Sequence, residues 1–425
     1  MNKSALKTFA TCARKELLKK IEAKALKIGI TEVNIKKAHI ESSDAIFIDG
    51  RQLSKEEKIQ RDQLISRIKQ NGYRQVLEEV AYTWFNRFTA LRFMEVNDYL
   101  PTGVKVLSSS NQDSADPDMI NEALALDLEM NKEYVYEMKL NNQTEELFKY
   151  LIIKHCNDLN KYLPFMFETI DDFTEILFPE GLLAKDSFIR QMTDIEFIPE
   201  ENWQDVEIIG WLYQFYISEE KDRVFTNLKK NIKVTKETLP AATQLFTPNW
   251  IVKYLVQNSL GRIWLESYSD SSLKKDMNYY LDEAGQDEVT LEELERIRYK
   301  NVNPEEITLL DPCCGSGHIL VYAFDLFYEM YFEKGYLDRE IPKLILEKNL
   351  FGLDVDERAI QLASFAVLMK ARGKYRRVFD QDINLNICSI QESNWITDNL
   401  IEKLSDRNNQ IKDMIVQIRK YLHRC

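Results

Sequence analysis

The sequence predicts an α/β protein with a large helical N-terminal domain, and two observations support this. Up to about residue 235 the apolar residues recur mostly at spacings of three and four, and strand-like alternation is confined to 45–48. After about residue 236, short β-type runs alternate with amphipathic stretches, as expected for βαβ units and a parallel sheet. We therefore expect domains at 1–235 and 236–425, with an exposed acidic insertion near 270–300.

The individual elements follow from the same patterns. The strongest helix is expected over 73–100, where five apolar residues share one stripe: Val76, Val80, Trp84, Phe88 and Leu91. In the second half, strands are expected at 307–310, 350–353 and 385–390, and helices at 319–332, 341–348 and 357–372.

The composition is that of a folded protein. The chain has 425 residues, of which 44% are hydrophobic, with 13 Gly and 10 Pro, so collagen-like and disordered classes are excluded. No apolar run approaches the roughly 18 residues of a membrane span, and the basic start has no apolar signal-peptide core. We expect a cytoplasmic protein with no membrane association. The six cysteines form no C-x-x-C pair and share no ligand spacing with the four histidines, so no metal site and no disulfide framework are predicted.

The charge of the chain limits how it meets nucleic acid. Its 56 Lys and Arg against 69 Asp and Glu give a net charge of −13, the wrong sign for coating nucleic acid through the overall field. Two local runs differ: 1–37 holds ten Lys and Arg against three Glu, and 370–377 holds five basic residues in eight. Each run is either a solvated helix face or a phosphate-binding patch.

A Gly-rich loop after the first predicted strand carries the main functional signal. It reads D-P-C-C-G-S-G-H, from Asp311 to His318, and its two glycines leave the backbone open to a ligand where the next helix presents free N–H groups. The second strand ends at Asp354, in F-G-L-D-V-D. Since neighbouring parallel strands deliver their C-terminal ends to one crevice, Asp354 is placed to reach ribose hydroxyls. We expect a nucleoside-cofactor site; a structural turn is the alternative.

These motifs resemble those of adenine-specific DNA methyltransferases, which bind S-adenosylmethionine. D-P-x-x-G-S-G-H is similar to their motif I, G-L-D-V-D to motif II, and T-Q-L-F-T-P, from Thr243 to Pro248, to motif X. The last element also makes physical sense, because Thr247 is a good helix N-cap and Pro248 a good first helical residue. The order X, I, II resembles the γ-type arrangement. The segments 84–97 (WFNRFTALRFMEVN) and 206–221 (VEIIGWLYQFYISEEK) closely resemble the PglX-type methyltransferase of BREX phage-defence systems.

The resemblance implies a fold, a cofactor and partners. The C-terminal part would be the first half of a Rossmann-like class I methyltransferase sheet that binds S-adenosyl-L-methionine, and the partners would be double-stranded DNA and other BREX defence proteins. Asp311 and the backbone of Gly315–Gly317 would hold the methionine part, and Asp354 the ribose hydroxyls. The implied cofactor-binding residues are Phe246, Thr247, Asp311, Pro312, Gly315, Ser316, Gly317, Asp354, Val355 and Gln391. Among these, Val355 would lie on the adenine face, Phe246 and Thr247 would close the other side, and Gln391 would lie near the adenine.

The family's catalytic motif is not found in this sequence. Transfer to an adenine amino group uses (N/D)-P-P-(Y/F), and the chain contains no Pro-Pro at all. We therefore assign no catalytic residue and expect negligible methyl transfer by this chain alone. The resemblance calls for about seven strands where about three are predicted, so the rest is expected beyond Cys425, either because the reading frame is truncated or because another chain completes the sheet.

Other interpretations remain open at the level of sequence. His318 is a packed helix residue or a base, and Cys313 and Cys314 are loop-fillers unless their thiols are reactive. The chain is alternatively a non-catalytic DNA-binding or assembly subunit of a defence complex, with Lys19, Lys20 and Lys24 on phosphate. A dinucleotide-dependent enzyme is a third possibility, but the loop lacks the G-x-G-x-x-G spacing.

Overall fold

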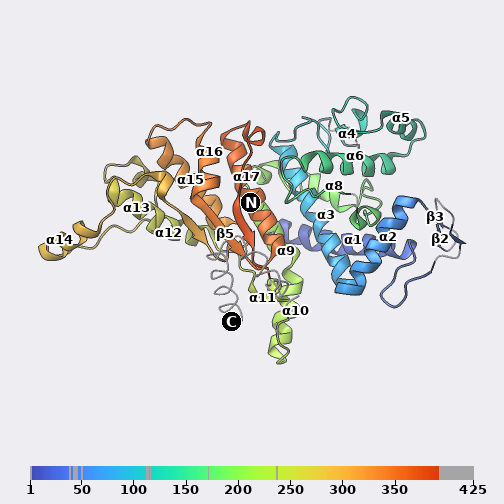
Figure 1. Cartoon of the computed structure of the whole chain (residues 1–425), viewed down its shortest axis with the longest axis horizontal. Coiled ribbons are helices and arrows are strands. Elements are labelled where there is room, and N and C mark those ends of the chain that lie inside the picture. Colours follow the sequence, from blue (N-terminus) through green and yellow to red (C-terminus); the bar gives the residue numbers. More distant parts are fainter. Residues whose placement is uncertain are drawn as a thin grey trace, which may run out of the picture.

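The computed structural model describes residues 2–37, 40–41, 46–48, 51–111, 114, 116–170, 172–235 and 238–391. The molecule is elongated, with the N-terminal helices gathered at one end and the helix α14 projecting at the other (Figure 1). The predicted boundary after residue 235 borders on residues 236–237, which lie outside the described part of the chain.

The N-terminal part is helical, as the apolar spacing predicts. Its helices are α1 (Lys3–Lys27), α2 (Lys55–Asn71), α3 (Tyr73–Val96), α4 (Asp118–Asn121), α5 (Lys132–Leu140), α6 (Thr144–Leu159), α7 (Phe173–Ile176), α8 (Phe188–Thr193), α9 (Glu207–Tyr216) and α10 (Ser218–Lys229), with a 3-10 turn at Glu200–Trp203. The strand-like stretch near 45–48 contributes β2 (Ile46–Ile48), which pairs antiparallel with β1 (Ile40–Glu41) and β3 (Arg51–Leu53).

Helix α3 is the core helix of this part. All five residues of its predicted stripe are buried, which confirms the expected apolar face. Three charged residues of the same helix, Arg87, Arg92 and Glu95, are buried as well, at 3%, 0% and 3% exposure. The helix is therefore enclosed on all sides over its second half, which an amphipathic pattern does not predict.

Two of the buried charges of α3, Arg92 and Glu95, are compensated by each other and by neighbouring segments. Arg92 Nη1 lies 2.7 Å from Glu95 Oε1, and Arg92 Nη2 reaches Glu200 at 3.2 Å. The second carboxylate oxygen of Glu95 accepts the Leu107 backbone N–H at 2.6 Å, and the Ser108 hydroxyl donates to Oε1 at 2.6 Å. A charge removed from water needs such partners, so this network fixes the loop after α3 on the core.

The second part contains a three-stranded parallel sheet in the order β4-β5-β6, formed by Leu309–Asp311, Leu350–Asp354 and Asn386–Ser389. These strands confirm the three predicted from sequence. Helices α15 (His318–Glu333) and α17 (Glu357–Lys374) pack against the strands and against each other, so both cover the same face of the sheet. On the opposite face Leu310 is 59% exposed.

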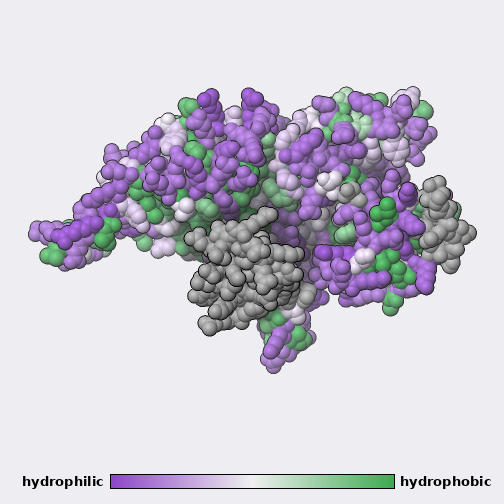
Figure 2. Space-filling view, viewed as in Figure 1, coloured by the Kyte–Doolittle hydropathy of each residue, from purple (hydrophilic) through white to green (hydrophobic). Residues whose placement is uncertain are grey.

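The second part contains five further helices and three 3-10 turns among the described residues. They are α11 (Leu239–Thr243), α12 (Asn249–Asn258), α13 (Leu260–Ser267), α14 (Glu288–Ile297) and α16 (Ile341–Leu344), with 3-10 turns at Ser272–Asp276, Pro304–Glu306 and Val378–Asp380. The helix predicted over 341–348 is split, because a π-helical turn follows α16 at Ile345–Asn349. None of the residues of α14 is buried, and the projecting helix carries both hydrophilic and hydrophobic side chains on its surface (Figure 2). Within the described residues, every helix is too short or too polar to cross a membrane.

The two basic runs are largely engaged within the chain. Lys24 and Lys27 bond the carboxylate of Glu180, and Lys20 donates to the Glu180 and Gly181 carbonyl oxygens at 2.7 and 3.0 Å. Burial raises the pKa of Glu180, but the hydrogen bonds from the two lysines outweigh it and bring the pKa to about 2. In the second run three basic residues pair with acids: Lys370 with Asp325, Lys374 with Glu329 and Arg377 with Asp380.

The buried pair on α3 gives a direct test of this packing. Arg92→Ala should lower the free energy of unfolding by about 3 to 5 kcal/mol, because it leaves Glu95 as a buried carboxylate without its charged partner. Arg74→Ala is the matched control, since its pair with Glu32 is exposed at both ends, at 78% and 53%; it should change stability by less than about 1 kcal/mol. Urea unfolding followed by circular dichroism measures both, and a similar small loss for the two variants would contradict the role given to the network.

Candidate cofactor site

The loop after β4 is held in a conformation that depends on its glycines. Gly315 has φ of +53° and Gly317 has φ of +86°, in the left-handed region that favours glycine. A Cβ at Gly315 would meet nothing within 4 Å, so the backbone at this position faces open space. A Cβ at Gly317 would lie 3.0 Å from the Cα of Ala363, so the packing of α17 against the loop requires a glycine here.

Asp354, at the end of β5, joins the two predicted motifs. Its Oδ2 accepts the backbone N–H of Gly315 at 2.9 Å, and its Oδ1 accepts that of Asp356 at 2.9 Å. The Gly-rich loop follows β4 and Asp354 ends β5, and these two strands are adjacent and parallel. The expectation that both strand ends meet at one place is therefore confirmed. The loop is tied a second time, because the Cys314 N–H donates to the Leu353 carbonyl at 2.9 Å.

The other residues of the Gly-rich loop differ in exposure. Asp311 is 8% exposed and accepts the Cys313 N–H at 3.1 Å. Burial raises the pKa of Asp311 and the nearby Asp354 adds to this, whereas the hydrogen bond from Cys313 opposes it. Cys314 is buried, and its Sγ would lie 3.2 Å from a Cβ on Gly352, so the Cys314 side chain fills the space beside β5. Burial raises the pKa of the Cys314 thiol. Pro312 and Cys313 are exposed.

The residues predicted from motif X lie beside the start of α15. The ring of Phe246 stacks on Trp211 with centroids 3.6 Å apart and meets the His318 ring at 3.9 Å. Thr247 is half-buried. The prediction of Thr247 as N-cap is wrong by one residue: Pro248 is the N-cap, with ψ of 139°, and α12 begins at Asn249 without a side-chain cap.

Two predicted residues lie at the outer side of the strand ends. Val355 is 46% exposed, so its side chain offers apolar surface next to Asp354. Gln391, the last residue of the described part, is exposed, and its amide donates to the Ser389 hydroxyl at 2.9 Å. The structure therefore brings Asp354 together with Gly315, with the exposed Val355 beside Asp354. Phe246 packs against the rings of Trp211 and His318.

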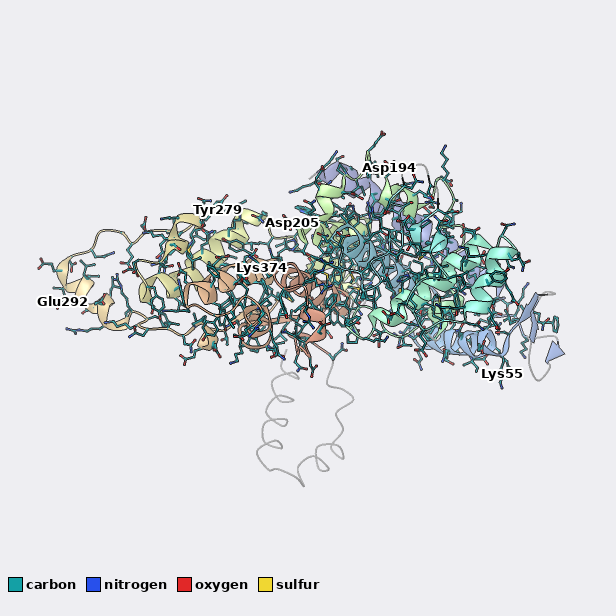
Figure 3. All side chains as sticks on the ribbon, turned by 90° about the horizontal axis from the view of Figure 1, so that it is seen from above. Lys55, Asp194, Asp205, Tyr279, Glu292 and Lys374 are labelled. Carbon is teal, nitrogen blue, oxygen red and sulfur yellow. The ribbon has the colours of Figure 1, made fainter. Side chains whose placement is uncertain are left out.

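Helix α9 of the N-terminal part contacts all three motif regions. Gly210 lies so close to the loop that a Cβ there would be 2.2 Å from His318 Cε1 and 2.9 Å from the Ser316 hydroxyl. Trp211 stacks on Phe246, and the Tyr213 hydroxyl donates to Asp356. Asp205, just before α9, lies near the middle of the long axis, between Lys55 and Glu292 at the two ends (Figure 3). The helix therefore sits at the junction of the two parts.

Sequence reasoning missed these three residues as part of the site. The spacing of eight residues between Trp203 and Trp211 would place both on one helical face, but Trp203 belongs to a separate 3-10 turn before α9. The available signal was the glycine inside an apolar helical stretch, which often marks a close approach of another segment.

Two cavities flank the junction. One of about 250 Å³ lies between α9, α12, α15 and α17 and is lined by Gly210, Ser316 and His318 among others. A larger one of about 700 Å³ lies between α3, α10 and the start of α17 and includes Asp356 and Arg358. Within the part of the chain that the structure describes, no group of three His, Cys, Asp or Glu side chains is arranged to hold a metal ion.

His318 packs against Phe246 and Gly210 at this junction and lines the smaller cavity. Its Nδ1 lies 3.4 Å from the Ser316 hydroxyl, and its Nε2 has no partner among the described residues. Burial lowers the pKa of His318 to about 4, while Asp205 opposes the shift. The ring is therefore neutral near pH 7. Its burial favours the prediction that His318 is a packed helix residue.

In this site an acidic residue at the end of the second strand accepts a hydrogen bond from the Gly-rich loop that follows the first strand. This arrangement is typical of α/β proteins that bind a nucleoside-containing cofactor. Comparison with known proteins narrows the class. Adenine-specific methyltransferase BrxX of Escherichia coli O9:H4 (strain HS) is 47% identical over 336 residues, which are 78% of this chain and 27% of that protein. Adenine-specific methyltransferase PglX of Lacticaseibacillus casei (strain Zhang) is 39% identical over 422 residues, 92% of this chain and 34% of that protein.

A more distant relative is the putative type II restriction enzyme and methyltransferase RM.MjaORFECS2P of Methanocaldococcus jannaschii, 26% identical over 174 residues, 36% of this chain and 15% of that protein. No family model matches the chain. The chain is a homologue of the BrxX and PglX adenine-specific methyltransferases and corresponds to their N-terminal part, about a third of their length or less. The resemblance identified from sequence is confirmed.

The contact between α9 and the Gly-rich loop can be tested by adding one methyl group. Gly210→Ala should destabilise the chain by about 1 to 3 kcal/mol, because the new Cβ overlaps the His318 ring. Gly373→Ala, in α17, is the control, since its Cβ would only meet the end of the Tyr99 side chain. Adding His318→Ala to Gly210→Ala should restore much of the loss. Thermal unfolding compares these three variants with the wild type, and a Gly210→Ala variant as stable as the wild type would contradict the contact.

The buried histidines predict a dependence of stability on pH. Burial brings the pKa of His155, as of His318, to about 4. An unfolded chain binds protons at an ordinary histidine pKa of about 6.5, so stability should fall as the pH drops from about 6.5 to 4, by up to about 1.4 kcal/mol per pH unit for each histidine. His318→Gln should reduce the slope of the unfolding free energy against pH by up to about 1.4 kcal/mol per pH unit, which corresponds to one proton. Urea unfolding at pH 4.5, 5.5 and 6.5 measures it, and an unchanged slope in the variant would contradict the assignment.

Proposed function

We propose that this chain provides the cofactor-binding half of a site-specific DNA adenine N6-methyltransferase of the BREX phage-defence type, with S-adenosyl-L-methionine as cofactor and double-stranded DNA as substrate. The observation that carries the proposal is the carboxylate of Asp354 held against the Gly315 N–H, in a chain homologous to proteins named adenine-specific methyltransferases.

The residues of the site fit the chemistry of such a cofactor. Each Asp354 oxygen accepts one backbone N–H and retains a free lone pair, so the carboxylate can still accept hydrogen bonds from ribose hydroxyls. The open position at Gly315 allows a ligand to approach the backbone, and the exposed side chain of Val355 offers apolar surface for an adenine ring. When bound, S-adenosylmethionine supplies the electrophilic methyl group.

In this proposal the parallel sheet is the first half of a Rossmann-like methyltransferase sheet. The order β4-β5-β6, the parallel pairing and the two helices on one face support it. We propose residues 1–235 as the helical domain and 236–425 as the cofactor domain, and the ten predicted residues from Phe246 to Gln391 as the binding set. Phe246 takes part through its packing on His318 rather than as an open face.

No catalytic residue is assigned to this chain. The 425 residues contain no Pro-Pro, so the (N/D)-P-P-(Y/F) tetrapeptide of the family is not in this sequence. The chain supplies cofactor alignment, and base flipping with attack on the methyl group is assigned to the whole methyltransferase. Other BREX proteins are proposed as its partners in the cell.

Cofactor binding is tested by titration calorimetry of the 425-residue chain with S-adenosylhomocysteine. Asp354→Ala should weaken binding by roughly tenfold or more, because hydrogen bonds to a charged group contribute about 1.5 to 3 kcal/mol. Asp287→Ala is the control: this aspartate caps the exposed helix α14 and should leave the affinity unchanged. A folded wild-type chain that does not bind, or equal binding by the Asp354 variant, would contradict the proposal.

A further inference from the structure

The hydrogen bond between Tyr213 and Asp356 connects the two parts of the molecule at the site. Tyr213 lies on α9 and is 2% exposed, and its hydroxyl donates to Asp356 Oδ2. Asp356 is 6% exposed, and its other oxygen accepts the backbone N–H and the Nε of Arg358 at 3.1 and 3.2 Å, which caps α17. One carboxylate therefore fixes both the start of α17 and its distance from α9.

The same loop holds the proposed ribose acceptor. The backbone N–H of Asp356 donates to Asp354 Oδ1, and Asp354 Oδ2 accepts the Gly315 N–H. A continuous path of hydrogen bonds thus runs from the Tyr213 hydroxyl through Asp356 and Asp354 to the Gly-rich loop. Movement of Asp356 changes the direction of the N–H that orients the Asp354 carboxylate.

Three tyrosines form one buried cluster beside this path, but they are not equivalent. Tyr82 lies edge-on to Tyr213 at 5.8 Å and to Tyr216 at 5.4 Å between ring centroids. The hydroxyl of Tyr216 has no hydrogen-bond partner among the described residues, and that of Tyr82 interacts with Asn86 of its own helix, whereas that of Tyr213 bonds Asp356. Of the three hydroxyls, that of Tyr213 is the one bonded to the cofactor loop, so the other two tyrosines serve as matched controls.

We propose that Tyr213 is a positioning residue of the cofactor site, which sets cofactor affinity by holding Asp356 and, through it, the carboxylate of Asp354 in the orientation that accepts the ribose hydroxyls. This inference rests on the proposed function. It places a determinant of cofactor binding on a helix of the N-terminal part, outside motifs X, I and II. Affinity for the cofactor thereby depends on the packing of α9, which itself packs against α1.

A purely structural role makes a different prediction. If Tyr213 only fastened the two parts together, its loss would weaken every ligand of the site alike. If it orients Asp354, its loss affects only the part of the affinity that comes from the ribose hydroxyls. A cycle that combines removal of the protein hydroxyl with removal of the ligand hydroxyls separates the two roles.

The experiment measures the affinity of the 425-residue chain for S-adenosylhomocysteine and for its analogue lacking both ribose hydroxyls. Tyr213→Phe should weaken S-adenosylhomocysteine about five- to tenfold and the analogue less than about twofold. The effect is smaller than the loss of a direct hydrogen bond to a charged group, because Tyr213 acts on the ligand only through Asp356 and Asp354. Tyr82→Phe and Tyr216→Phe, which remove hydroxyls of the same cluster that do not bond Asp356, should change neither affinity by more than about twofold. Thermal unfolding verifies that each variant is folded.

Equal weakening of both ligands by Tyr213→Phe, or no weakening of either, overturns the inference. Should Tyr213→Phe fail to fold, Asp356→Asn tests the same path, because it keeps the shape of the side chain and weakens its bonds; selective loss of S-adenosylhomocysteine supports the inference and equal loss overturns it. A wild-type chain that binds neither ligand overturns the proposed function itself. A wild-type chain that binds S-adenosylhomocysteine while the cycle shows no coupling overturns only the role of Tyr213.

Discussion

The close contact between helix α9 and the loops after β4 and β5 organises the rest of the structure. Gly210 allows the helix to touch His318, Trp211 stacks on Phe246, and Tyr213 bonds Asp356. Three neighbouring residues on one short helix thus meet three segments that are far apart in sequence. Because packed interiors respond to changes of a single methyl group, the positions of these segments are set jointly and not one by one.

Buried charge in the two parts of the molecule has a similar effect on the positions of segments. The buried Arg92–Glu95 pair and the Tyr213–Asp356–Arg358 group each contain a carboxylate whose lone pairs are satisfied by both side-chain and backbone donors. Burial of a charge is costly unless it is paired in this way, so each group fixes the relative positions of the segments that supply its donors. The basic residues of α1 have a similar internal use, because Lys20, Lys24 and Lys27 bond the segment at Glu180. The bonds made by these lysines do not favour a phosphate-binding role for that run.

The sequence predicted the local elements of the site well and their environment poorly. The three strands, the two long helices and the meeting of the Gly-rich loop with Asp354 at neighbouring strand ends follow from short-range patterns, namely apolar runs, glycines and an acid at a strand end. The burial of Arg87 and Arg92 and the role of α9 depend on tertiary contacts with segments about 80 to 150 residues away, which local periodicity does not encode. Gly317 shows the same difference: its positive φ is predictable from the loop, but its contact with Ala363 is not.

The arrangement of α9 also implies a thermodynamic link between cofactor binding and the N-terminal part. A ligand that binds only when the loops around Asp354 are ordered stabilises that state by mass action, by about 2.7 kcal/mol at a concentration one hundred times its dissociation constant. Since those loops are held by Asp356, and Asp356 by Tyr213, the stabilisation extends to the packing of α9 on the sheet domain. Linkage is reciprocal, so anything that strengthens or loosens the packing of α9 shifts cofactor affinity in the same direction. In the proposed cofactor site, the helical part is then a component of the site and not an independent domain attached to it.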